Sequence, residues 1–155
     1  MSGARPATAD DLADLAALAA VAVDELRPER GGELWARTIG RRAPFEPALA
    51  AAMVDPGRLL LCGTLSDATV GYASVRLDEL ADGARVAVIE DLYTLPDARE
   101  VGVGEALMDA VLVWARAEGA LGVDAIALPG MRHTKNFFET FGLTARAILV
   151  HRDLR

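Results

Sequence analysis

The sequence predicts an α/β (α+β) fold with a mixed, mostly antiparallel central sheet flanked by helices. Short runs of β-branched and apolar residues, bounded by Gly, Pro and Asp, alternate with longer segments whose apolar residues recur at helical spacing. Strands joined by tight turns indicate antiparallel pairing, and strands joined through a helix indicate parallel pairing. The length of 155 residues suits one domain, 1–155, with a buried core.

The first half of the chain predicts an edge strand, three helical segments and a hairpin. The edge strand is limited by Pro6. Thr8 and Asp11 resemble a capping box that starts a helix with one apolar face, and Pro28 ends that helix. We expect the carboxylate of Asp11 to be solvated. The strands are expected over 3–7, 58–65 and 69–77, and the second and third helices over 33–39 and 47–54.

The second half predicts a central strand over 85–95 and a helix over 104–118 that Gly119 ends. A further strand is expected over 123–128, where Pro129 and Gly130 stop it. A last helix over 132–141 and a final strand or strand pair over 144–154 complete the chain.

The composition argues against nucleic-acid and membrane partners. The formal net charge is −7, whereas non-specific nucleic-acid binding needs a basic face. No segment has the apolar length of a membrane span, and the first residues contain no apolar signal core. Cys62 is the one cysteine, so we expect a reducing, cytoplasmic location. Neither His133 nor His151 stands at ligand spacing from Cys or carboxylates, so no metal is expected.

The segment from Ile89 to Leu107 carries the strongest functional signal. It consists of a strand, a turn with Pro96, and a helix opened by Gly102 and Gly104. The first N–H groups of a helix have no partner inside it, and the helix dipole makes that end positive. Glycines let a phosphate approach the backbone, and Arg99 adds a cation. We interpret residues 99–104 as a diphosphate cradle; an ordinary glycine loop is the alternative.

A dinucleotide-binding fingerprint, Gly-x-Gly-x-x-Gly, is a competing interpretation. Gly102 and Gly104 fit its first two positions, and Asp124 lies where a ribose-binding acid would stand. Leu107 occupies the third position, where it is too large for close packing of a helix on a strand. The strands before the motif also read as antiparallel. We therefore disfavour this interpretation.

Arg99, Gly102 and Gly104 match the pattern Arg/Gln-x-x-Gly-x-Gly/Ala, and the chain thereby resembles the GNAT superfamily of N-acetyltransferases. A second block, NFFETFGL over 136–143, is similar to a later helix of that family. The resemblance implies a GNAT-like acyl-CoA acyltransferase fold and transfer of an acetyl group from acetyl-CoA, without a metal, to a small-molecule or peptide amine. A homodimer is compatible with it. A non-catalytic acyl-CoA-binding sensor or interaction domain is the alternative function.

The resemblance also implies site residues. The pantetheine arm of the cofactor would lie where the strands ending near residues 95 and 128 splay apart. The segment between the first helix and the second strand would line the acceptor site, although the base rate favours a core role for its aromatics and solvation for its arginines. Its candidates are Trp35, Arg37, Arg41, Arg42 and Phe45. Expected cofactor contacts are Leu92, Tyr93, Thr94, Leu95, Arg99, Glu100, Val101, Gly102, Val103, Gly104, Lys135 and Asn136.

The catalytic candidates lie in the central strand. A protonated amine must lose a proton before it attacks a thioester, and a carboxylate can accept that proton. Strand residues alternate between faces, so only one of Glu90 and Asp91 is expected to face the acceptor, and we favour Glu90. The N–H of Tyr93 or Thr94 is the candidate oxyanion donor. Phe138 stands where many relatives carry a tyrosine acid, which leaves the general acid open.

Overall fold

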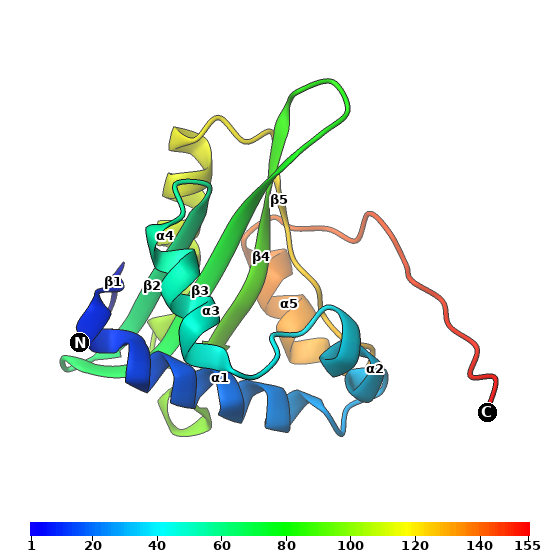
Figure 1. Cartoon of the computed structure of the whole chain (residues 1–155), viewed down its shortest axis with the longest axis horizontal. Helices are drawn as coiled ribbons and strands as arrows, with labels where there is room; N and C mark the ends of the chain where they lie inside the picture. The colour runs from blue at the N-terminus through cyan, green and yellow to red at the C-terminus, as the bar shows by residue number, and fades with distance from the viewer.

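Five strands form one sheet in the order β1-β2-β3-β4-β5 (Figure 1). The computed structural model describes residues 1–155. Three of the four strand pairs are antiparallel, and β4 pairs with β5 in parallel. The predicted mixed, mostly antiparallel sheet is therefore confirmed. The strands are β1 (Ser2–Pro6), β2 (Arg58–Leu65), β3 (Ala68–Glu79), β4 (Arg85–Thr94) and β5 (Val123–Asp124).

Helices cover both faces of the sheet, as Figure 1 shows. On one face lie α1 (Leu12–Leu26) and α3 (Phe45–Val54), and on the other lie α4 (Val103–Ala117) and α5 (Arg132–Thr140). The short helix α2 (Gly32–Thr38) follows α1. None of these helices combines the length and apolar character needed to cross a bilayer.

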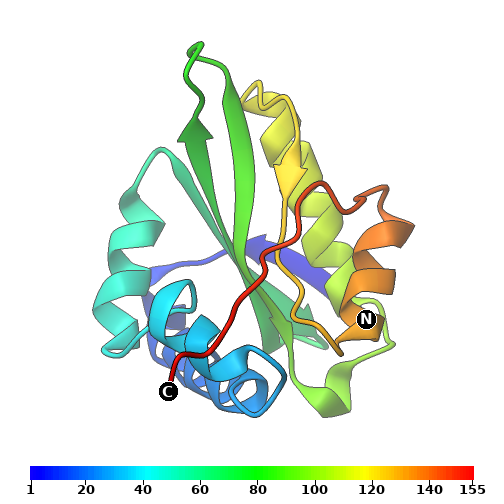
Figure 2. The ribbon, with the colours of Figure 1, turned by 90° about the vertical axis from the view of Figure 1, so that its right-hand side faces the viewer.

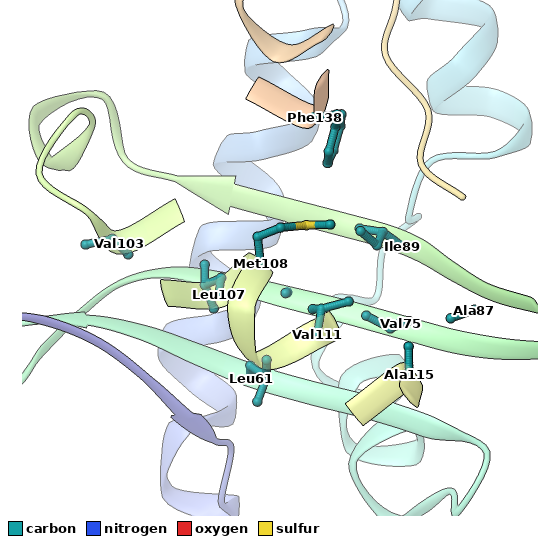
Figure 3. Close-up of a cluster of buried hydrophobic side chains, with 11 residues drawn as sticks. Leu61, Val75, Ala87, Ile89, Val103, Leu107, Met108, Val111, Ala115 and Phe138 are labelled. Atoms are coloured by element: carbon teal, nitrogen blue, oxygen red, sulfur yellow. The ribbon is translucent and has the colours of Figure 1, made fainter. Parts of the chain in front are cut away.

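The sheet separates two apolar clusters. Leu107, Met108 and Val111 recur at helical spacing on α4, and all three are fully buried against the strands. Figure 3 shows these side chains over those of the sheet, with Phe138 of α5 beside Met108. On the opposite face, Leu15 of α1 belongs to the second cluster with side chains of α3 and the strands. Burial on both faces holds β4 in the middle of the protein.

Local signals determine the elements at the start of the chain and in the hairpin. Ser66 and Asp67 have φ angles of 49° and 69°, as expected in a tight turn between β2 and β3. The capping box is present: the Asp11 carboxylate accepts the Thr8 N–H at 2.8 Å. Asp11 is only 8% exposed, so its expected solvation was wrong. The Arg5 guanidinium compensates its burial through bonds of 2.8 Å and holds the pKa of Asp11 well below its usual range.

Two predicted strands differ from the structure. β5 contains only Val123 and Asp124, and residues 125–128 are not in a strand. The segment 144–154 contains no strand, and Ile148, Leu149 and Val150 are 84–87% exposed. Figure 2 shows this C-terminal segment crossing in front of the sheet. The sequence pattern there is β-like, but a strand also requires a hydrogen-bonding neighbour, which neither segment has.

Candidate functional site

The turn between β4 and α4 presents a row of backbone N–H groups. Glu100 and Gly102 have positive φ angles of 65° and 95°. The five N–H groups from Val101 to Glu105 make no hydrogen bond within the protein. Together with the positive end of the α4 dipole, they form an arrangement suited to binding an anion. This geometry fits the diphosphate cradle predicted for residues 99–104.

One of the two glycines of this turn also permits close packing. A Cβ on Gly102 would lie 2.8 Å from the Ser2 hydroxyl oxygen of β1. A Cβ on Gly104 would lie 3.4 Å from the Phe137 ring of α5. Gly102 therefore lets β1 lie against the turn, whereas a side chain at Gly104 would make only an ordinary contact with α5.

Arg99 is tied to the end of α1. Its Nε donates to the Thr94 carbonyl at 2.9 Å, and its Nη2 donates to both carboxylate oxygens of Glu25 at 2.8 and 2.9 Å. The Tyr93 hydroxyl donates to the same carboxylate at 2.6 Å. Burial, followed by the nearby Glu25, raises the pKa of Tyr93 to about 12. Glu25 was not among the predicted site residues, because nothing near it in the sequence indicates a contact with β4.

One edge of β4 has no neighbouring strand along most of its length. β5 pairs with β4 only at Ala87–Val123 and Val88–Asp124. β5 therefore ends at Asp124, whereas the resemblance implied a strand that runs to residue 128 and splays away from β4. The Leu95 N–H bonds to the Val70 carbonyl of β3 at 2.8 Å. Because antiparallel bonding alternates, the Tyr93 N–H also faces β3, so the expectation that it could be the oxyanion donor was wrong. The peptide groups of Leu92 and Thr94 face the open edge instead.

A β-bulge changes the direction of the two acidic side chains. Ser74 pairs with Asp91 and Val75 pairs with Ile89, so Glu90 is an extra residue in β4. The bulge interrupts the alternation of side chains, and Glu90 and Asp91 line the same cavity. The expectation that only one carboxylate would face this side was therefore wrong.

Both carboxylates are ion-paired. Glu90 contacts the Arg58 guanidinium, and its second oxygen lies 3.5 Å from Arg76. Asp91 accepts from Nε of Arg41 at 2.8 Å, and Nη2 of Arg41 lies 3.1 Å from the buried Ser74 hydroxyl. The side chains of Arg41 and Asp91 are only 10% and 9% exposed. Burial raises the pKa of Asp91 above its ordinary value, although Arg41 opposes the shift.

The cavity beside these carboxylates, here called the β4 cavity, has a volume of about 300 Å³. Two of the five acceptor candidates, Arg41 and Arg42, line it, whereas Trp35, Arg37 and Phe45 do not. The Trp35 ring instead packs on Gly40, where a Cβ would lie 3.0 Å away. The lining residues are Thr38, Ile39, Gly40, Arg41, Arg42, Ala48, Glu90 and Asp91.

A second cavity of about 620 Å³, here called the α5 cavity, lies at the start of α5. Lys135 and Asn136, both predicted cofactor contacts, line it, and the Lys135 ammonium lies 2.7 Å from Glu139. Phe138 points into the apolar core and is 8% exposed (Figure 3). The cavity also includes six residues that were not among the expected cofactor contacts: Ala127, Leu128, Pro129, Gly130, Met131 and Arg132.

Comparison with known proteins agrees with this geometry. Residues 18–143 match the model of the acetyltransferase (GNAT) family, and no curated protein sequence matches. A tetramutant of a Bacillus halodurans protein is 18% identical, with a TM-score of 0.81 over 97% of this chain and 99% of that one. Two further structures are each 16% identical over 100% of this chain and 99% of theirs. AAC(6′)-Iy, in complex with the bisubstrate analogue CoA-S-monomethyl-acetylneamine, has a TM-score of 0.75, and the aminoglycoside 6′-N-acetyltransferase of Acinetobacter baumannii has 0.74.

Proposed function

Because the chain belongs to the GNAT family of acetyltransferases, we propose that it transfers an acetyl group from acetyl-CoA to the amine of a small molecule or peptide. One observation carries the proposal: the unpaired N–H row of Val101–Glu105, the open edge of β4 and two carboxylates follow one another along a single strand and turn. An extended thioester with a diphosphate at one end matches that order.

The cradle and the strand edge would hold acetyl-CoA. We assign the diphosphate to the N–H groups of Val101–Glu105, because five unpaired donors at a helix N-terminus suit a multiply charged anion. The Leu92 carbonyl and the Thr94 N–H face the open edge, where they can bond the amides of the pantetheine arm. Lys135 and Asn136 are further contacts at the α5 cavity. The bisubstrate analogue in the AAC(6′)-Iy complex supports a coenzyme A site in this fold.

Arg99 has a supporting role in this assignment. Its guanidinium is bonded to Glu25 and to the Thr94 carbonyl, so it fixes the end of β4 and the turn that follows. If the Arg99 guanidinium also contacted the diphosphate, it would bind Glu25 and the phosphate at the same time.

Acetyl-CoA supplies an activated acetyl thioester, and the protein must provide a base and an oxyanion donor. A primary amine has a pKa of about 10.4 and is mostly protonated at neutral pH. We assign proton removal to Glu90, whose side chain is 20% exposed, against 9% for Asp91. We assign the oxyanion to the N–H of Leu92, which faces the open edge nearest to Glu90, and leave the N–H of Thr94 to the pantetheine arm.

Thiol release from acetyl-CoA in the presence of single amines tests the proposal. We expect release that depends on the amine, together with a product that has gained one acetyl group. Coenzyme A binding without turnover on any amine would contradict it and would favour a non-catalytic acyl-CoA-binding domain. The ion-paired carboxylates and the buried Phe138, which lacks a hydroxyl, are the observations that would suit that second function.

A further inference from the structure

The charges around the β4 cavity restrict the chemistry of an acceptor. The two acids that line it, Glu90 and Asp91, already have cationic partners within the protein. Glu90 contacts Arg58 and lies 3.5 Å from Arg76, and Asp91 is 2.8 Å from Arg41. These contacts neutralise the carboxylates over the short range at which a bound ligand would interact with them.

Arg42 is the one charged residue in the lining without an ion pair. It follows Arg41 in the loop between α2 and α3 and is exposed at the cavity. Its guanidinium donates no side-chain hydrogen bond to the protein, whereas Arg41 donates to Asp91 and Ser74. The lining therefore offers a ligand one free cation and no free anion.

We infer that the acceptor amine carries a carboxylate and that Arg42 determines this specificity by binding it; the inference rests on the proposed acetyl transfer to an amine. A guanidinium binds a carboxylate through two parallel hydrogen bonds, which orient the ligand as well as attract it. The amine at the other end of a short acceptor then lies beside Glu90. Amino acids and short peptides have this chemistry.

Polycations such as polyamines and aminoglycosides fit this cavity poorly. Every ammonium group beyond the reacting one would meet Arg42 or would have to displace Arg41, Arg58 or Arg76 from the carboxylates. Displacement of Arg41 is unfavourable because its side chain is 10% exposed and it also bonds to Ser74. The net charge of −7 attracts cations at long range, but the paired carboxylates provide no short-range anion to bind them.

The test compares 4-aminobutanoate with butylamine, since these primary amines differ mainly in the carboxylate. We expect kcat/KM to be about 10- to 100-fold higher for 4-aminobutanoate, the factor of a charge-assisted hydrogen bond. Arg42→Ala should remove that preference by raising KM for 4-aminobutanoate alone, and Arg42→Lys should restore part of it. Arg37→Ala is the matched control, because Arg37 is an exposed arginine of α2 outside the cavity.

Further measurements distinguish amino-acid from peptide acceptors, and distinguish a failure of the acceptor inference from a failure of the proposed acetyl transfer. Free glycine and the dipeptide Gly-Glu distinguish an amino acid from a peptide. Higher kcat/KM for spermidine or kanamycin than for 4-aminobutanoate would overturn the inference, as would an equal loss for both amines in Arg42→Ala. If no amine is acetylated, calorimetric binding of 4-aminobutanoate and butylamine decides instead. An Arg42-dependent preference for the carboxylate would then support the inference although the proposed transfer had failed, and equal binding would overturn it.

Discussion

Replacing Arg41 by alanine should destabilise the protein strongly, because it leaves a buried carboxylate without a partner. The side chains of Arg41 and Asp91 are 10% and 9% exposed, and their charged atoms lie 2.8 Å apart. Breaking a buried pair from one side typically costs about 3–5 kcal/mol, since the remaining charge stays desolvated. In a chain of this size, each kcal/mol lowers the thermal midpoint by about 2–4 °C.

The loss should depend on pH in a defined direction. In the folded wild-type protein, the pKa of Asp91 is already above its ordinary value. Protonation of Asp91 therefore favours the folded state in acid, and this contribution to the free energy of unfolding declines as the pH rises through that pKa. Without Arg41 the pKa rises further. The free energy of unfolding of Arg41→Ala should therefore approach that of the wild type near pH 4 and fall furthest below it near pH 7.

Urea unfolding at both pH values measures the effect. Arg42→Ala is the matched control and should change the free energy of unfolding by about 0.5 kcal/mol or less, because Arg42 is exposed and unpaired. The double variant Arg41→Ala with Asp91→Asn should recover much of the loss at pH 7, since no charge remains buried. Equal losses at pH 4 and pH 7 would refute the electrostatic reasoning, and a loss as small as that of Arg42→Ala would refute the pairing itself.

Three further predictions concern the base, the cradle and the core. Glu90→Gln should lower kcat by about 100-fold or more in a thiol-release assay while leaving the Kd for acetyl-CoA little changed. Wild-type turnover in this variant would show that another residue is the base. Gly102→Ala should lower the free energy of unfolding by about 1–2 kcal/mol, because the φ angle of Gly102 is 95°. The variant should also bind coenzyme A more weakly in calorimetry, and an unchanged Kd would show that this turn does not bind the diphosphate. Leu107→Ala, at a fully buried position, should cost about 2–5 kcal/mol in chemical unfolding, and a value under 1 kcal/mol would contradict the packing of α4.

The elements with local signals were predictable from the sequence. The strand 58–65 and the turn at Ser66–Asp67 have the predicted bounds, because β-branched and apolar runs meet a two-residue turn there. α4 was predicted to within one residue at each end, because its apolar stripe and the flanking Gly102 and Gly119 mark both ends. The same local pattern correctly placed the unpaired N–H row at the start of α4.

Features that depend on two distant segments were not predictable in this way. The bulge at Glu90 is a property of the register between β3 and β4, and it brings both carboxylates to one cavity against the alternation of a regular strand. The contacts of Glu25 with Tyr93 and Arg99 join residues 68 and 74 positions apart. The C-terminal segment shows the converse case, in which a β-like pattern has no strand to pair with.

The placement of acetyl-CoA along β4 and the turn before α4 is the central claim, and backbone amide chemical shifts test it most directly. Addition of coenzyme A to isotopically labelled protein should shift the amide signals of Val101–Glu105 most strongly, because their N–H groups are unpaired at the positive end of α4. Leu92 and Thr94 should shift with them at the open edge of β4. Shifts confined to other parts of the protein, or no shift at saturating coenzyme A, would contradict the account.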